Sequence, residues 1–384
     1  MAGKRSDQSS AGFGRGQATT LAIAGILGAA WIGGTVAGKQ RFDPVTGVSP
    51  LVATNLESAA APAGSTVSWD LPNLDHERVD YWVDRFTTSK RDDFTRFLER
   101  SGRYVPMISA KLEERGMPQD LIYLAMIESG FNPKAYSPAN ASGLWQFIAE
   151  TGRRYGLDVN RAVDERNDPE KATDAALTYL TELHERFGSW YLAAAAYNTG
   201  ENRVGRIMRE ETGSEKGTEH SYYEIWERLP RETRDYVPLM VAAARIAKEP
   251  QKYGFGEVEL QAPLAYEEVV VDPATPLSAI AKAAGVEVQD IKSLNPQLKL
   301  TRTRNDMRSV LRVPPGTRTA FLVNWPTVRE EKTIAVQTYR IRRGDSLLGI
   351  ARRHGVTVQA IKDANSLRGS RIIAGKTLKI PARG

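Results

Sequence analysis

The chain has 384 residues, of which 41% are hydrophobic, and it contains no cysteine. This length is enough to bury a sizeable core and to form two or three domains. The lack of cysteine excludes disulfides, thiolate metal ligands, cysteine nucleophiles and a lipid-modified N-terminal cysteine. The four histidines lie far apart and show no metal-ligand spacing, so we expect neither a metal nor another cofactor.

The net charge of +6 is unevenly distributed along the chain. Residues 336–384 hold eleven Lys and Arg but only two Asp and Glu, so they carry +9 and the remainder of the chain carries −3. This basic segment is suited to an anionic wall polymer or a membrane surface, or it forms a merely solvated face. No nucleic-acid recognition motif accompanies it, so we do not expect a nucleic-acid partner.

The N-terminus has the features of an export segment. Three basic residues precede an uncharged stretch at 16–38, which is long enough to cross a bilayer. Small residues around 35–37 also fit a signal-peptide cleavage site. We therefore expect residues 1–38 to direct export, with a retained membrane anchor and a cleaved signal peptide as the two alternatives. Residues 39–68, rich in Ala, Pro, Ser, Thr and Gly, are typical of a flexible linker.

From 69 to about 258 the hydrophobic spacing is helical, which predicts an all-α domain. Turn signals containing Gly, Asn and Pro separate the segments. The predicted helices span 80–99, 104–115, 119–129, 168–186, 192–209 and 234–247.

Beyond residue 258 the pattern changes to a repeated β-α-α-β unit. The segments 277–288 and 347–358 align residue by residue, and a short β-like run precedes and follows each helical pair. The sequence therefore predicts two small α+β modules, at 264–315 and 336–382, with 316–335 as the linker that joins them.

Glu128 is the leading candidate for a catalytic residue. It lies at the end of an apolar helical run, where ionisation of a carboxylate is costly, so its pKa should be raised. Cleavage of a glycosidic bond needs a carboxylic acid that is protonated near neutral pH. The alternative is a solvated glutamate at a helix end with no function.

Three motifs support the catalytic interpretation. They are Glu-Ser-Gly-Phe-Asn-Pro at 128–133, Ser-Gly-Leu-Trp-Gln-Phe at 142–147 and Ala-Tyr-Asn-Thr-Gly at 196–200. In this order and spacing they resemble the family 1 lytic transglycosylases, lysozyme-like enzymes that cleave bacterial peptidoglycan. The helical lead-in and the C-terminal repeats are most similar to the membrane-bound type D branch. The resemblance implies an all-α lysozyme-like catalytic domain followed by two LysM-like modules, in an exported enzyme of the cell envelope.

The same resemblance implies a mechanism with a single acid and base. Glu128 would protonate the oxygen between MurNAc and GlcNAc, and its carboxylate would then take the proton of the MurNAc C6 hydroxyl. The product would be a 1,6-anhydro ring, with peptidoglycan as substrate. Two alternatives stay open, a hydrolase of the same bond and a non-catalytic scaffold that binds the wall.

Further site residues are assigned by the motifs. Gln146, Tyr197 and Asn198 match substrate-binding positions of the family, and Tyr236 resembles a tyrosine that hydrogen-bonds the catalytic acid. Ser129 would bind either the carboxylate or the sugar amide, although a hydroxyl at a helix end also bonds its own backbone.

An aromatic residue, Trp145, stands where many relatives have methionine. It suits either a sugar-lined site or the core of the domain.

The second repeat resembles LysM, a glycan-binding module that uses the loop after its first strand and the loop before its second. The corresponding residues of the first loop are Gly344, Asp345, Ser346 and Leu347. The first repeat departs from this pattern, with Asp-Pro-Ala-Thr-Pro at 272–276. It would keep the fold and serve either as a weak glycan binder or as a spacer.

Overall fold

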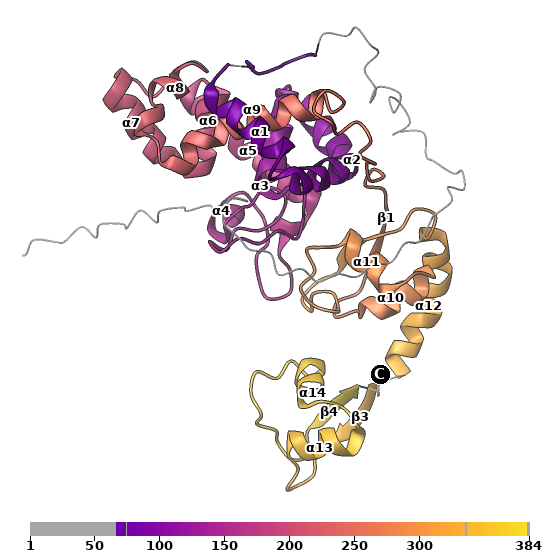
Figure 1. Cartoon of the computed structure of the whole chain (residues 1–384). Coiled ribbons are helices and arrows are strands. Elements are labelled where there is room, and N and C mark those ends of the chain that lie inside the picture. Colours follow the sequence, from indigo (N-terminus) through magenta and orange to yellow (C-terminus); the bar gives the residue numbers. More distant parts are fainter. Residues whose placement is uncertain (1–66, 74, 335, 382–384) are drawn as a thin grey trace, which may run out of the picture. The chain divides into compact units, whose positions relative to one another are not determined.

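The computed structural model describes residues 67–73, 75–334 and 336–381 (Figure 1). The expected export segment at 1–38 and nearly all of the expected linker lie outside these residues. None of the helices in the described part of the chain is both long and apolar enough to span a bilayer. Two compact units are present: the described part of the first covers 67–157 and 169–262, and the second includes 158–168 and the described residues from 263 onward.

The first unit is built from helices, which confirms the predicted all-α class. Its buried centre is formed by α3 and α6: α3 packs against α2 and α9, and α6 packs against α5, α7 and α9. Four consecutive alanines at 193–196 are fully buried on α6, and their small side chains let its neighbours approach closely. The helices, labelled in Figure 1, are α1 (Glu77–Thr87), α2 (Arg91–Glu114), α3 (Ile122–Ser129), α4 (Ala149–Arg154), α5 (Pro169–Phe187), α6 (Trp190–Thr199), α7 (Glu201–Thr212), α8 (Ser221–Glu224) and α9 (Arg231–Lys248).

The predicted break between residues 99 and 104 was wrong. Helix α2 runs through Gly102 without interruption, and the chain instead breaks at 88–90, between α1 and α2. A Cβ at Gly102 would lie 2.3 Å from the carbonyl oxygen of Gln261. This glycine therefore allows the segment after α9 to approach the helix, and it does not end the helix.

The single helix predicted at 192–209 is in fact two. Gly200 has a φ of 95°, a backbone conformation that glycine adopts readily, and it separates α6 from α7. Tyr197 and Asn198 consequently lie in the last turn of α6.

The second unit contains the two predicted β-α-α-β modules. In each module the two strands pair in antiparallel fashion, β1 with β2 and β3 with β4. The elements of the first module are β1 (Glu267–Val271), α10 (Leu277–Ala284), α11 (Val288–Leu294) and β2 (Ser309–Val313). Those of the second are β3 (Val336–Arg340), α13 (Leu347–His354), α14 (Val358–Ala364) and β4 (Thr377–Pro381).

An asparagine after the second helix shows that the two modules are equivalent. Nδ2 of Asn295 donates to a carbonyl of α11 and to Arg312 O on β2, both at 2.7 Å. Nδ2 of Asn365 donates in the same way to a carbonyl of α14 and to Lys379 O on β4, at 2.8 and 2.7 Å. Arg312 and Lys379 therefore occupy corresponding positions.

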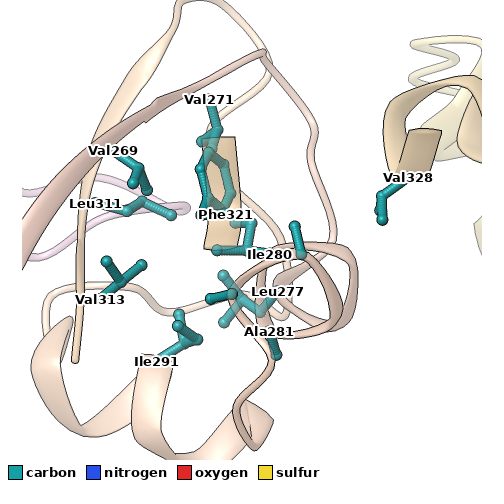
Figure 2. Packing of buried hydrophobic residues seen from close by; sticks show 12 residues of the cluster. Val269, Val271, Leu277, Ile280, Ala281, Ile291, Leu311, Val313, Phe321 and Val328 are labelled. Atoms are coloured by element: carbon teal, nitrogen blue, oxygen red, sulfur yellow. The ribbon is translucent and has the colours of Figure 1, made fainter. Parts of the chain in front are cut away.

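The segment expected as a linker, 316–335, consists largely of helix α12 (Arg318–Ile334). Its Phe321 is 1% exposed, packs into the core of the first module and stacks on Trp325 with ring centroids 5.0 Å apart. Figure 2 shows the Phe321 ring among Val271 and Ile280. This helix therefore belongs to the hydrophobic core of the first module, because its apolar residues complete that core.

Candidate active site

Glu128 lies in the last turn of α3, and only 4% of it is exposed. Every residue from Leu124 to Ser129 is buried, so the carboxylate has little access to water. Burial raises the pKa of Glu128 to about 7, although the hydrogen bond from Tyr236 acts in the opposite direction. The side chain is therefore substantially protonated at neutral pH, as a general acid must be.

Tyr236 on α9 holds the carboxyl group. Its Oη donates a hydrogen bond of 2.5 Å to Oε1 of Glu128, across 108 residues of sequence. Burial and the neighbouring carboxylate raise the pKa of Tyr236 well above its ordinary value, so the phenol stays a donor. The adjacent Asp235 makes two 2.7 Å bonds with Arg78 of α1, which fixes the first turns of α9.

The motif glycine after Glu128 has a steric role. Gly130 caps α3 with a φ of 56°, and a Cβ there would lie 2.1 Å from the ring of Phe97. Phe131 follows with a φ of 55° and is fully buried. The chain therefore turns sharply after Glu128, and only glycine fits against the Phe97 ring.

Gly130→Ala should lower the unfolding free energy of the first unit by about 2–5 kcal/mol, since it combines a left-handed backbone with overpacking. Gly116 is the matched control, with a φ of 62° and no atom within 4 Å of an added Cβ. Gly116→Ala should cost only about 1–2 kcal/mol. Urea unfolding followed by tryptophan fluorescence measures both. Equal losses would show that contact with Phe97 is unimportant.

Residues 142–147 form a tight loop beside the end of α3. The loop is closed by a 3.0 Å bond from Ser142 N to Phe147 O. The Ser129 hydroxyl lies 2.8 Å from Leu144 O in this loop and 3.2 Å from Ala125 O in its own helix. Ser129 thus bonds to backbone, which is the alternative noted for it, and it joins the end of α3 to the second motif.

Two other predicted residues join neighbouring elements. The Tyr197 hydroxyl donates to Trp145 O at 2.7 Å, and Asn198 Oδ1 accepts from Thr233 Oγ1 at 2.8 Å. Burial, followed by the charge of Glu128, raises the pKa of Tyr197 well above its ordinary value. The structure therefore places Tyr197 within the electrostatic reach of Glu128, and Asn198 bonds to the helix that carries Tyr236.

The remaining second-motif residues point inward. Trp145 is fully buried, and its Nε1 donates to Thr173 Oγ1 at 2.9 Å, so it belongs to the core. Gln146 has a φ of 48° and is 4% exposed. Its Nε2 lies 2.8 Å from Gly143 O and 3.2 Å from Ala135 O, which fixes the plane of the amide.

The family described as "Transglycosylase SLT domain" matches residues 106–219, the region that holds all three motifs. The chain carries an SLT domain. The family "LysM domain" matches residues 339–381, and "Lytic transglycosylase MltD, LysM-like domain" matches residues 265–329. Both C-terminal modules are therefore of the LysM type, as predicted.

Proteins named as lytic transglycosylases are similar to parts of this chain. The chain is 32% identical over 294 residues to "Membrane-bound lytic murein transglycosylase D" of Escherichia coli (strain K12). The matched region covers 74% of this chain, and it spans 64% of the length of that relative. It is 32% identical over 125 residues to "Membrane-bound lytic murein transglycosylase C" of Glaesserella parasuis, 28% of this chain and 34% of that one. Among solved structures, the 70 kDa soluble lytic transglycosylase of Escherichia coli matches 47% of this chain and 30% of its own, with 24% identity and a TM-score of 0.35.

One polar group of the SLT domain was not predicted from the sequence. The ring of Tyr179 lies 5.3 Å from that of Tyr197, and its hydroxyl donates to Glu201 Oε2 at 3.0 Å. Burial opposes ionisation of Glu201, but bonds from its own backbone, Tyr179 and Arg154 outweigh it and lower its pKa. A charged carboxylate therefore lies at the end of this aromatic pair. The position of Glu201 directly after the third motif was the available signal.

In the LysM domain, the predicted loop residues form the turn into α13. Gly344 has a φ of 89°, and Asp345 Oδ2 accepts bonds of 2.8 Å from Arg342 N and from the Tyr339 hydroxyl. Ser346 caps α13 through Gly349 N. Leu347 is only 2% exposed, so its side chain stabilises the core of the module and is not presented to a ligand. No cluster of three or more His, Asp or Glu side chains suited to a metal ion occurs in the described part of the chain.

Proposed function

We propose that this protein is a peptidoglycan lytic transglycosylase of the cell envelope, which cleaves the β-1,4 bond between MurNAc and GlcNAc and leaves 1,6-anhydro-MurNAc ends. The observation that carries the proposal is the state of Glu128. This carboxyl group is buried within an SLT domain, has a pKa of about 7 and is held through one oxygen by Tyr236.

In the first step, protonated Glu128 gives its proton to the glycosidic oxygen, and the bond from that oxygen to C1 of MurNAc breaks. Because Tyr236 donates to Oε1, the proton is on the other oxygen of the carboxyl group. The substrate's own N-acetyl group stabilises C1, so a second carboxylate is not needed as nucleophile.

In the second step, the Glu128 carboxylate accepts the proton of the C6 hydroxyl while that oxygen bonds to C1. The anhydro ring closes, Glu128 is protonated again, and no water is consumed. Tyr236 acts as a positioning residue in both steps, because its hydrogen bond stabilises the charged form and keeps the carboxyl plane fixed.

Three residues are proposed to bind the sugar, and their internal bonds support this by fixing their orientation. Gln146 offers its amide carbonyl, since Nε2 is bonded to backbone. Asn198 offers its Nδ2, since Oδ1 accepts from Thr233. Tyr197 offers an aromatic ring within the electrostatic reach of Glu128.

Digestion of purified sacculi followed by mass spectrometry tests the reaction. We expect anhydro-muramic ends from the wild-type protein. Products with reducing ends would show that the protein is instead a hydrolase of the same bond. If no product is released, the protein is better explained as a non-catalytic scaffold that binds the wall.

The LysM domain at 336–384 is proposed to fasten the enzyme to the wall. Its net charge of +9 attracts the peptide carboxylates of peptidoglycan, and this component should weaken with salt. Deletion of 336–384 should reduce sacculus pull-down by about tenfold or more, because a loss of about 1.4 kcal/mol of binding free energy already lowers affinity tenfold. Cleavage of short soluble muropeptides should be unchanged.

A matched variant separates charge from glycan contacts. Arg340, Arg352 and Lys379 are exposed on β3, α13 and β4, outside the two loops of the expected glycan site. Replacing all three by glutamine should remove much of the salt-dependent binding and leave binding in high salt unchanged. If neither the deletion nor this variant alters pull-down, the LysM domain is not the wall anchor.

Residues 1–38 are proposed to direct export of the chain. N-terminal sequencing of the mature protein distinguishes a cleaved signal peptide from a retained anchor: a start near residue 38 would exclude the anchor.

A further inference from the structure

The segment 158–168, which joins α4 and α5 in sequence, pairs with the first LysM-like module inside the second unit. Asp164 N donates to Gln297 O at 2.9 Å, and Lys299 N donates to Ala162 O at 3.0 Å. These two bonds flank an antiparallel bridge between Val163 and Leu298. The module thus adds backbone hydrogen bonds to a segment of the SLT domain sequence, in the manner of strand pairing.

A buried ion pair reinforces this pairing. Arg312 on β2 contacts Asp168 Oδ1 through Nη2 at 3.0 Å, and the two side chains are 8% and 3% exposed. The ring of Tyr266 lies 4.9 Å from the Arg312 guanidinium. At the corresponding position of the second module, Lys379 is exposed. A buried cation on the outer face of a small sheet is costly unless it has a partner, so Arg312 is suited to Asp168 rather than to solvent.

The two loops that would form a glycan site in the first module are bonded to each other. Thr303 N donates to Thr275 O at 2.8 Å, and Thr275 N donates to Thr303 Oγ1 at 2.9 Å. Further backbone bonds join Ala274 to Arg304 and Leu277 to Thr301. Both threonines are fully buried. A ligand could enter between these loops only by breaking the bonds that join them.

The second module differs at the same place. Within residues 339–381, the structure shows no backbone hydrogen bond between 342–347 and 366–374. The bonds of Asp345 go to Tyr339, Arg342 and Arg353, all on the side of the first loop. The loops of this module are therefore available to a ligand.

We propose that the first LysM-like module is a brace for the segment 158–168 and does not bind glycan. Its bonded loops explain the loss of the usual motif at 272–276, and its β2 face and the turn at 297–299 bind a part of the SLT domain sequence instead. This brace would be present whether or not the protein cleaves peptidoglycan.

Hydrogen exchange of the full-length protein tests the brace. Arg312→Met removes the cation and leaves Asp168 buried without it. Exchange of amides in 158–168 should then become about 100-fold faster, the scale expected when a buried pair is broken. Lys379→Met, at the corresponding exposed position, should not change exchange in this segment. Equal exchange in wild type and Arg312→Met would overturn the brace.

A disulfide provides a second test that does not depend on the stability of Arg312→Met. The chain has no cysteine, and Val163 and Leu298 form a directly opposed pair with the short Cα separation of a non-hydrogen-bonded position. Val163→Cys with Leu298→Cys should form a disulfide under mild oxidation. Val163→Cys with Arg368→Cys, the corresponding position of the second module, should not. Failure of the first pair, or equal bonding of both, would overturn the pairing.

The claim that the first module does not bind glycan is tested by the same exchange experiment, with a hexamer of N-acetylglucosamine as the added ligand. Amides in 342–347 and 366–376 should be protected, and those in 272–276 and 301–304 should not change. Protection of 272–276 would show that the first module binds glycan. If neither module is protected, the proposal that 336–384 binds the wall glycan is wrong. The exchange result for Arg312→Met still tests the brace independently.

Discussion

Glu128→Gln should lower turnover of peptidoglycan by at least roughly 10²- to 10⁴-fold, the contribution of a general acid and base. Glutamine has the same shape and still accepts the Tyr236 hydrogen bond, but it cannot donate a proton of suitable acidity to the glycosidic oxygen. Release of anhydro-muropeptides from sacculi measures the change. Undiminished release by Glu128→Gln would remove this residue from the reaction.

The pH dependence follows from the direction of the pKa shift. The first step needs protonated Glu128, and that form decreases as pH rises through its pKa of about 7. In the wild-type protein kcat/KM should therefore fall about tenfold per unit at pH values above the pKa. A flat profile from pH 6 to 9 would contradict the assignment.

Stability provides the control for folding. Because the folded-state pKa of about 7 exceeds the ordinary value of 4.5, the native protein binds more protons between these values, and Glu128 lowers stability as pH rises through this window. The loss amounts to about 3 kcal/mol above pH 7. Glu128→Gln should therefore be at least as stable as wild type at pH 8, and a lower stability there would leave its inactivity open to a folding defect.

Tyr236→Phe should lower kcat by about 10- to 100-fold, since one hydrogen bond to a charged group contributes about 1.5–3 kcal/mol. The variant keeps the ring and loses only the 2.5 Å bond to Glu128 Oε1. KM should change little. Because this bond lowers the pKa of Glu128, its loss should move the alkaline limb of the rate profile to higher pH.

Tyr222 supplies the matched control for Tyr236. It is a buried tyrosine whose hydroxyl bonds to backbone carbonyls of Thr233 and Arg234, on the same helix as Tyr236. Tyr222→Phe should leave the pH profile in place. A normal kcat with a raised KM in Tyr236→Phe would move Tyr236 from positioning the acid to binding the substrate.

Local pattern was sufficient to predict much of this protein. The apolar run before Glu128 predicted both a buried helix end and the upward shift of its pKa, because a helix that is apolar on all sides is packed inside a domain together with the carboxyl group at its end. The internal repeat predicted two β-α-α-β modules, since equivalent segments of 277–288 and 347–358 align directly. The helical spacing of apolar residues at 192–209 also placed Tyr197 and Asn198 correctly on a helix, although that helix is shorter than predicted.

Long-range packing decided the rest. The gap predicted between residues 99 and 104 lies inside α2, where Gly102 allows a close contact with Gln261 from the segment after α9. The segment 316–335 was assigned to a linker, because local pattern does not show that its Phe321 and Val328 pack into the core of the first module.

The sequence by itself determined the class of fold, the modular order and the identity of the candidate acid, since each follows from residues that are neighbours in the chain. Only the tertiary structure decided how that acid is held. Tyr236 meets Glu128 across 108 residues, and Arg312 meets Asp168 across 144. The hydrogen bonds and ion pairs of a buried group depend on such distant partners, and no periodicity within one segment can specify them.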